Sequence, residues 1–313
     1  GASPWPAGAG LGTGTEVPLP VNRDRPGAGF PQEPAGSGAG RARPARVGGM
    51  AELAEIGVIG GSGFYSLLED AEEVAVDTPY GPPSDRITLG RIGGRSVAFL
   101  PRHGRGHVHP PHRIPYRANI WALHSLGVRQ VLAPNAVGSL RTEYGPGTLV
   151  IPDQLVDRTS GRIQTFYDTG GAVHVPFADP YCPHGRATAV RVAREAGWET
   201  VDGGTMVVIE GPRFSTRAES QWYASAGWTV IGMTGHPEAV LARELAICYT
   251  SICLVTDRDA GIEAGQGVTQ QEVLAFFRAH AGRLRALTKE IAAALPAERT
   301  CPCATALDGM KLP

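Results

Sequence analysis

The chain has 313 residues, of which 42% are hydrophobic, and a formal net charge of -1 at pH 7. This composition supports a sizeable globular core, whereas the near-neutral charge and the lack of basic blocks interleaved with aromatic residues argue against nucleic-acid binding. No apolar stretch reaches the roughly 18 residues that a membrane helix needs, and no signal peptide is evident, so we expect a cytoplasmic protein.

The N-terminal segment, residues 1–49, is dominated by Gly, Pro, Ala and Arg and has scarcely any apolar periodicity. Such a segment cannot bury enough apolar surface to offset the entropy of ordering, so we predict a disordered leader. Met50 looks like a natural start, which would make the leader an upstream translation artefact. We therefore expect the folded domain at residues 50–296, followed by a C-terminal tail at 297–313.

From Ile56 onward, short apolar runs alternate with segments of helical periodicity. The predicted strands cover residues 56–59, 96–100, 128–133, 206–209, 229–233 and 247–255. The predicted helices cover residues 116–126, 187–196, 216–226, 238–246 and 270–295. This alternation indicates an α/β fold, a single domain with a mostly parallel twisted central sheet flanked by helices. The ligand site of such a fold lies at the carboxyl ends of the strands.

Polar residues follow the first two predicted strands. The first strand ends in GGSGF, whose glycines let backbone amides approach an anion while Ser62 adds a hydroxyl donor. An ordinary tight turn explains this motif equally well, since it matches neither the dinucleotide-binding glycine pattern nor a serine-hydrolase elbow. The second strand is followed by Arg102, whose planar fork suits phosphate, and by His103, a further donor.

Three later strand ends add further polar groups. Asn135 and Ala136 follow the third strand, and Met233 and Thr234 follow the fifth. The last strand ends in VTDRDAG, which places Asp257 and Asp259 two positions apart. A single Asp there would be an ordinary turn former or helix cap, but two on the same side of a strand end form an acceptor-rich edge.

Two groups of residues have metal-ligating chemistry. The first is a set of histidines in one loop, His103, His107, His109 and His112. Glycines and prolines prevent their regular presentation and no cysteine joins them, which favours ordinary loop or interface histidines. The second is the Cys301-Pro302-Cys303 sequence, a strained redox pair or half a metal site. Because no second pair stands in the sequence, we predict plain thiols in a tail and no metal.

Eight motifs occur in order between residue 56 and about residue 295. They are IGVIGGSGF, DTPYGPPSD, RHGRGH, YRANIWAL, DQLVDRTSGR, GTMVVIEGPRFSTRAES, MTGHPEAVLARE and TDRDAG. Together they resemble the trimeric nucleoside phosphorylase family, and most of all its methylthioadenosine phosphorylase branch. The resemblance implies reversible phosphorolysis of a purine nucleoside by a cyclic homotrimer, with inorganic phosphate as cosubstrate and no metal or organic cofactor.

The resemblance also gives roles to individual residues. The implied phosphate ligands are Ser62, Arg102, His103, Asn135, the Ala136 amide and Thr234. Phe214 would stack on the purine and Met233 would lie under the ribose, although both also fit as core residues. The 5' substituent would meet His174 from a neighbouring subunit, together with Val273 and Leu274 on the last helix. Gln270 departs from the family pattern and could narrow or polarise the mouth of this pocket.

The Asp pair suits the edge of a 6-aminopurine. Asp257, the predicted catalytic residue, would donate a proton to purine N7 as negative charge accumulates on the departing base. Asp259 would accept a hydrogen bond from the N6 amino group, whereas the O6 of a 6-oxopurine would face an acceptor. Arg258 stands between them, where related enzymes often have an aromatic or aliphatic residue.

The sequence thus predicts phosphorolysis of 5'-methylthioadenosine to adenine and 5-methylthioribose 1-phosphate, a reaction of purine and methionine salvage. The alternatives are a general purine nucleoside phosphorylase for adenosine or 6-oxopurine nucleosides, and a 5'-halo-5'-deoxyadenosine phosphorylase. Two rivals belong to other classes. A purine sensor would not need the phosphate ligands, and a hydrolytic nucleosidase would need a positioned water base in their place.

Overall fold

The computed structural model describes residues 46–47, 52–61, 64, 67–263 and 267–311. Strand β1 (Arg46–Val47) pairs in parallel with strand β3 (Glu69–Val76), so two residues of the predicted leader form a short strand. The rest of the predicted leader lies outside the described residues. The predicted phosphate ligand Ser62 also lies outside them. Within the described part of the chain, every helix is too short or too polar to cross a membrane.

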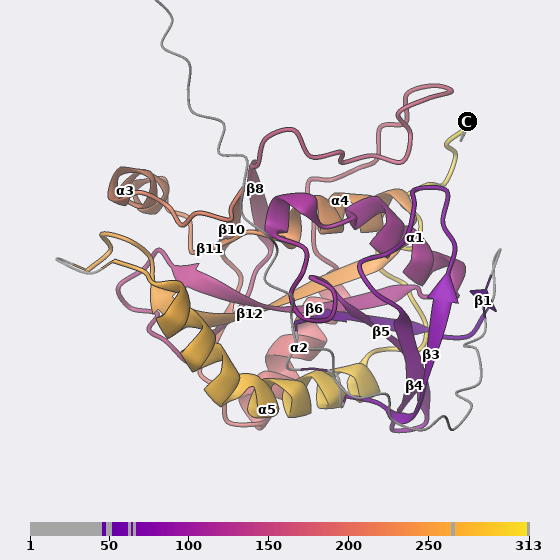
Figure 1. Ribbon diagram of the computed structural model, residues 1–313, viewed down its shortest axis with the longest axis horizontal. Helices are drawn as coiled ribbons and strands as arrows, with labels where there is room; N and C mark the ends of the chain where they lie inside the picture. The colour runs from indigo at the N-terminus through magenta and orange to yellow at the C-terminus, as the bar shows by residue number, and fades with distance from the viewer. Residues whose placement is uncertain (1–45, 48–51, 62–63, 65–66, 264–266, 312–313) are drawn as a thin grey trace, which may run out of the picture. The chain divides into compact units, whose positions relative to one another are not determined.

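A mixed sheet of twelve strands, counted over the described residues, forms the centre of the folded unit (Figure 1). One path through it runs in the order β1, β3, β4, β5, β2, β6, β11, β10, β8, while β12 pairs with both β6 and β7. Seven of the strand pairs among these residues are parallel and four are antiparallel. The mostly parallel sheet expected from the sequence is confirmed.

Every predicted strand is present, most with longer bounds. They are β2 (Ile56–Gly60), β5 (Arg95–Pro101), β6 (Gln130–Ser139), β10 (Thr205–Ile209), β11 (Val230–Gly232) and β12 (Cys248–Arg258). The sequence did not indicate β3, β4 (Ile87–Ile92), β7 (Leu149–Ile151), β8 (Gln154–Arg158) or β9 (Thr200–Asp202). β3 is exposed and acidic, β4 is interrupted by glycine, and β8 and β9 contain polar residues, so none of these four presents a continuous apolar run. β7 is apolar throughout but has only three residues.

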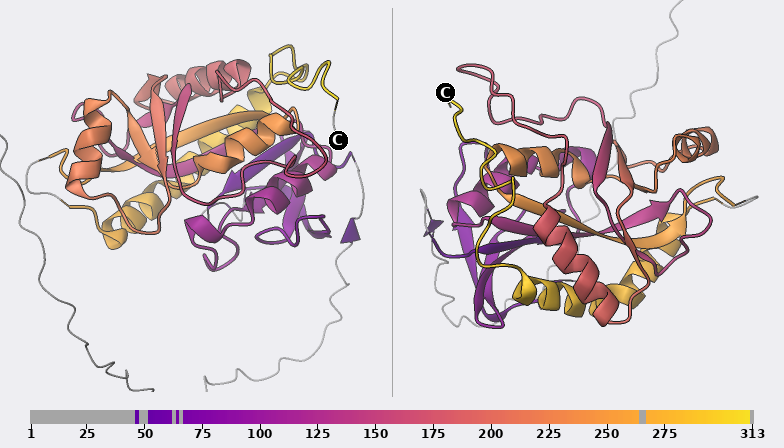
Figure 2. Two further views of the ribbon diagram at one scale, coloured as in Figure 1. Left: turned by 90° about the horizontal axis from the view of Figure 1, so that it is seen from above. Right: turned by 180° about the vertical axis from the view of Figure 1, so that it is seen from behind.

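The helices cover both faces of the sheet. Figures 1 and 2 show α1 (Tyr116–Ser125) and α4 (Gly235–Glu244) on one face, and α2 (Pro183–Glu195) and α5 (Gln270–Ala294) on the other. Helix α3 (Arg217–Ser225) begins with a capping box, in which the Thr216 side chain and Glu219 satisfy each other's backbone amides. A short 3-10 turn covers Pro111–Arg113.

Apolar side chains fill the space between these layers. Helices α1 and α4 pack on the sheet through the buried side chains of Ile120, Leu123 and Leu241. Helix α5 packs on the other face through Leu284 and Leu287. Burying such a side chain stabilises the fold by about 1.5–3 kcal/mol. Strand β12 is buried from Cys248 through Thr256 because helices cover both of its faces, which explains its continuous apolar run.

The strand directions determine where a ligand can bind. Strands β2, β5, β6 and β12 are mutually parallel, so their carboxyl ends share one edge. Strand β11 instead enters antiparallel to β6, with Ile231 opposite Gly138. The residues after β11 therefore return along β6 toward the same edge, and polar groups from strands of both directions meet there.

The C-terminal segment packs against the folded domain instead of extending from it as a free tail. It forms turns over residues 301–309 in which Cys301, Cys303 and Ala306 are buried. Cys182 and Cys248 lie beside them, and all are free cysteines. The sequence contains no second pair of neighbouring cysteines, but the fold brings Cys182 and Cys248 beside Cys301 and Cys303.

Candidate active site

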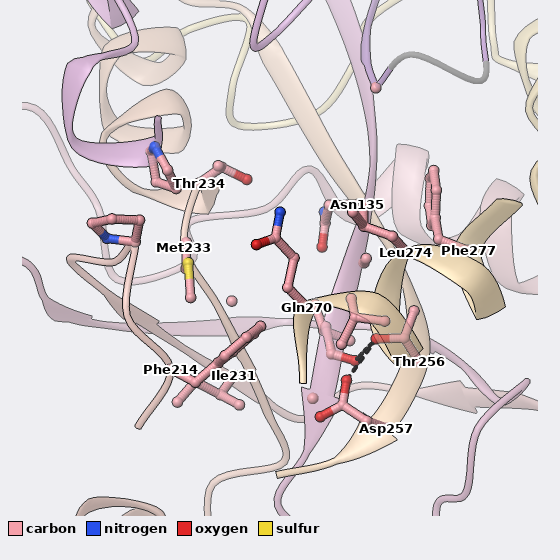
Figure 3. Close-up of a pocket in the computed structure, with 18 of the residues that line it drawn as sticks. Asn135, Phe214, Ile231, Met233, Thr234, Thr256, Asp257, Gln270, Leu274 and Phe277 are labelled. Atoms are coloured by element: carbon pink, nitrogen blue, oxygen red, sulfur yellow. Dashed lines mark hydrogen bonds between the residues drawn. The ribbon is translucent and has the colours of Figure 1, made fainter. Parts of the chain in front are cut away.

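A cavity of about 430 Å³ lies at the shared edge of the parallel strands (Figure 3). Its volume falls within the range of roughly 300–1,000 Å³ that is typical of small-molecule sites. The predicted residues that line it are Arg102, His103, Asn135, Ala136, Phe214, Met233, Thr234, Asp257, Asp259, Val273 and Leu274. Gly61, next to Ser62, also lines the cavity. His174 is exposed on the surface and does not line it.

A β-bulge at the end of β12 positions the Asp pair. Val255 pairs with Val137 and Asp257 pairs with Gly138, so Thr256 is an extra residue on β12. Bulges redirect side chains at strand ends. A Cβ added at Gly138 would lie 3.2 Å from Oδ2 of Asp257 and 3.0 Å from Ile231, so glycine leaves the room that Asp257 occupies.

Asp257 is a carboxyl group with little polar compensation. Thr256 Oγ1 donates to Asp257 Oδ1 at 2.7 Å, as Figure 3 shows. Burial disfavours the charged form and, with smaller contributions from Asp259 and Glu272, outweighs this hydrogen bond and raises the pKa of Asp257 to about 6. An appreciable fraction of Asp257 is therefore protonated near neutral pH, which suits a general acid.

Asp259 is more buried than Asp257 and is held by a side chain from α3. The Ser220 hydroxyl donates to Asp259 Oδ2. Burial raises the pKa of Asp259, and the hydrogen bond from Ser220 opposes that shift. The hydroxyl thus stabilises the ionised form, in which the carboxylate retains acceptor capacity toward the cavity.

Arg102 lies at the opposite end of the cavity in a buried ion pair. Its Nε and Nη2 donate to the two carboxylate oxygens of Glu238 at 2.6 and 3.1 Å, and both groups are almost completely buried. Tyr249 donates a further hydrogen bond to Glu238, at 2.7 Å. Nη2 and Nη1 of Arg102 also donate to the carbonyls of Ile59 and Pro134. The fork expected to face phosphate therefore faces Glu238, and Nη1 retains one hydrogen for a ligand.

His103 has a defined tautomer. Its Nδ1 donates to the carbonyl of His109 at 2.8 Å, and its ring stacks on His107 with centroids 4.0 Å apart. Burial lowers the pKa of His103 to about 3, so the ring is neutral and Nε2 is an acceptor. Such a nitrogen can receive a hydrogen bond from a protonated phosphate oxygen, whereas the sequence suggested a donor.

Two other residues expected at the phosphate have different surroundings. Both amide hydrogens of Asn135 are used within the protein, on Ala133 O and Ser251 Oγ at 2.9 Å each. Asn135 thus links the middle of β6 to β12 beside the cavity. Thr234 precedes α4, and its hydroxyl makes no capping hydrogen bond to that helix. This hydroxyl faces the cavity opposite Asn135 in Figure 3.

Apolar side chains form two walls between these polar ends. Phe214, Ile231 and Met233 form one wall, and Leu274 and Phe277 of α5 form the other (Figure 3). Phe214 and Met233 are only half-buried, as expected of side chains that face a cavity. A flat apolar ligand fits between such walls. The amide of Gln270 projects from the start of α5 into the space between them.

Comparison with known proteins assigns the family. Residues 55–293 match the family described as Phosphorylase superfamily. The purine nucleoside phosphorylase of Streptomyces coelicolor is 64% identical over 267 residues, which cover 82% of this chain and 95% of that protein. The chain is a member of the phosphorylase superfamily.

Two further relatives refine this assignment. The S-methyl-5'-thioadenosine phosphorylase of Mycolicibacterium smegmatis is 58% identical to this phosphorylase, over 82% of this chain and 98% of that protein. A crystal structure of a methylthioadenosine phosphorylase from an Antarctic soil metagenomic library superposes with a TM-score of 0.78 at 42% identity. That match covers 82% of this chain and 92% of the other. The nucleoside phosphorylase fold and the family resemblance are confirmed.

Two residues that support the walls of the phosphorylase site were not singled out from the sequence. Arg162 is buried, and its guanidinium donates to the carbonyls of Met233, His236 and Glu210. It thereby joins the segments that follow β10 and β11, which form one wall of the cavity. Glu238 was missed likewise. Both lie within the motifs quoted above, but their partners are distant in sequence and leave no local signal.

Proposed function

We propose that this phosphorylase catalyses the reversible phosphorolysis of 5'-methylthioadenosine to adenine and 5-methylthioribose 1-phosphate. The observation that carries the proposal is the Asp257 and Asp259 pair, which lines the same cavity as Arg102, His103 and Thr234. One end of the cavity thus offers carboxyl groups to a base, and the other offers polar groups to an anion. The chemistry needs no cofactor, since inorganic phosphate is a cosubstrate.

The reaction exchanges one bond for another at the anomeric carbon. A phosphate oxygen forms a bond to C1' as the bond from C1' to N9 breaks, and the electron pair of that bond passes to the purine. Asp257 supplies a proton to N7, so the base departs neutral. Because burial raises the pKa of Asp257 to about 6, the protonated form is available at the pH of most cells.

Base selectivity follows from the acceptor character of the same edge. Ionised Asp259, held by Ser220, accepts a hydrogen bond from the N6 amino group of adenine. A 6-oxopurine places an O6 lone pair there instead, which costs about 1–3 kcal/mol for an unpaired, desolvated group. This difference favours adenine nucleosides over those of hypoxanthine and guanine.

The 5' group of the nucleoside meets α5. Val273, Leu274 and Phe277 form an apolar surface that suits a methylthio group. Halogens are comparably small and form weak hydrogen bonds, so a 5'-halo-5'-deoxyadenosine also fits. The amide of Gln270 is the polar exception on this side of the cavity.

The proposal includes a homotrimer in which His174 completes the 5' pocket of a neighbouring subunit. Support comes from surface features of the single chain. His174 is exposed, and the apolar side chains of Val108 and Ile163 are 65% and 55% exposed. A partner that covers these side chains would remove apolar surface from water. A cytoplasmic location stays a prediction.

A general purine nucleoside phosphorylase is the second candidate. The name of the Streptomyces coelicolor relative favours it, as does Gln270, whose amide can bond to a 5'-hydroxyl. The Asp pair disfavours inosine and guanosine as substrates and therefore supports the first candidate. It does not distinguish adenosine from methylthioadenosine.

A substrate panel tests these functions. Base release from methylthioadenosine, adenosine, inosine and 5'-chloro-5'-deoxyadenosine should be measured with and without phosphate. We expect release to require phosphate and kcat/KM to be highest for methylthioadenosine. Equal rates without phosphate would indicate a nucleosidase, binding without release would indicate a sensor, and a preference for inosine would support the second candidate.

A further inference from the structure

Four cysteines that are far apart in the sequence meet at the end of the molecule where β12 begins. Cys182 is the N-cap of α2, Cys248 is the first residue of β12, and Cys301 and Cys303 lie in the C-terminal turns. Their sulfur atoms all lie within 4.8 Å of one another, and all four side chains are buried. They contact one another rather than the large apolar cores on either face of the sheet.

The spacing of these sulfurs matches a tetrahedral metal site. Zinc binds thiolates at about 2.3 Å, which places neighbouring sulfurs roughly 3.8 Å apart. The observed limit of 4.8 Å and the 3.3 Å separation of the Cys248 and Cys301 sulfurs bracket that value. Small side-chain rotations would bring all four sulfurs to one central ion.

The groups around the sulfurs are those that thiolates require. The backbone amide of Gly185 donates to Cys182 Sγ at 3.4 Å, in the first turn of α2. The Arg243 guanidinium lies 3.7 Å from Cys303 Sγ, and the Arg299 guanidinium lies 4.0 Å from Cys248 Sγ. Four thiolates on Zn²⁺ carry a net charge of about -2, which two guanidinium groups neutralise. Disulfides are uncharged and would gain little from these donors.

We propose that Cys182, Cys248, Cys301 and Cys303 bind one structural zinc ion that fastens the C-terminal segment to α2 and β12. Four protein ligands leave no open position for a substrate, so the ion does not take part in catalysis. Cys248 and Asp257 lie at opposite ends of β12, roughly 30 Å apart at the usual rise per residue of a strand. The ion therefore supports the fold, apart from the chemistry at the cavity.

Metal analysis of the full-length chain tests this proposal. We expect about one zinc ion per chain in tag-free protein purified without chelators, measured by mass spectrometry of the elements. Cys301→Ser and Cys303→Ser should each lose most of the zinc and lower the unfolding temperature. Cys253→Ser is the matched control, because Cys253 is a buried free cysteine outside the cluster, and it should retain the ion.

A second measurement on the unmutated chain keeps the test decisive if the variants fail to fold. After removal of zinc by a chelator, added Co²⁺ should restore the unfolding temperature and give intense sulfur-to-cobalt charge-transfer absorption typical of several thiolate ligands. Purified protein without zinc would overturn the proposal. Alkylation and mass mapping would then show whether the cysteines are free or joined as disulfides, and either state would count against zinc binding. Loss of zinc from Cys253→Ser, or cobalt binding without thiolate absorption, would overturn the ligand assignment.

Discussion

Two buried charged regions face the same cavity and differ in how their charges are compensated. The Arg102 guanidinium and the Glu238 carboxylate form a bidentate pair with Tyr249 as an additional donor. Asp257 and Asp259 have hydroxyl donors but no ion-pair partner among the residues that the structure describes, and burial raises the pKa of both. The paired region is suited to hold the site in shape, and the unpaired region retains the capacity to exchange protons and hydrogen bonds with a substrate.

The largest expected effect concerns the unpaired region. Asp257→Asn replaces an acid that can transfer a proton with an amide that cannot, while the side chain keeps its shape. We expect kcat/KM for methylthioadenosine to fall about 10²- to 10⁴-fold, the usual contribution of general acid catalysis. Steady-state kinetics at saturating phosphate would measure this, and a fall of less than about threefold would remove Asp257 from the catalytic role.

The pH dependence of the same reaction separates proton transfer from simple positioning. Asp257 must be protonated to act, so kcat/KM should decline as the pH rises through about 6. In Asp257→Asn this decline should be absent, while the ionisation of phosphate affects both proteins alike. An identical profile in the two proteins would contradict proton donation by Asp257.

Breaking the paired region should mainly affect stability. Glu238→Ala leaves the buried Arg102 charge without its partner, which should lower the free energy of unfolding by about 3–5 kcal/mol and raise the KM for phosphate. Glu195→Ala removes an exposed partner of Arg191 and serves as the control, with an expected change within about 1 kcal/mol. Denaturant unfolding compares the two variants. Equal effects would show that the buried pair is not special.

The unpaired region should show the opposite stability effect. An Asp whose pKa is higher in the folded state loses stability as the pH rises from its unfolded value near 3.8 through about 6. Asp257→Asn should therefore stabilise the protein above pH 6, by up to about 3 kcal/mol, and have little effect below pH 4. Unfolding curves at pH 7.5 and 4 would check this, and destabilisation at pH 7.5 would indicate that the carboxylate is satisfied.

The smallest effect should come from the second carboxylate. Asp259→Ala removes an acceptor for the N6 amino group, so the preference for methylthioadenosine over 5'-methylthioinosine should fall by about 1–3 kcal/mol. Ser220→Ala is a milder companion variant, because it removes the donor that stabilises the Asp259 carboxylate but keeps the carboxylate itself. If neither variant alters the ratio of kcat/KM for the two nucleosides, Asp259 has no part in reading the base.

The sequence by itself determined the alternation of apolar strands and helices, and with it the layered fold. It also indicated the edge of the sheet at which ligands bind. Apolar runs show where each strand ends, and the carboxyl ends of parallel strands lie at one edge. The Asp pair was visible because both residues follow one apolar run. The exposed, acidic strand β3 and the three-residue strands β7 and β9 were missed, because segments so polar or so short give no distinct strand pattern.

Only the tertiary structure decided what each polar group faces. Arg102 meets Glu238 across 136 positions of the chain, so its fork is paired within the protein, and the bulge at Thr256 sets where Asp257 points. The cysteines of the C-terminal segment meet Cys182 and Cys248 only because α2 and β12 begin side by side. The physical reason is common to these cases. A buried charge or thiol takes its character from the atoms around it, and those atoms come from segments that local sequence patterns do not connect.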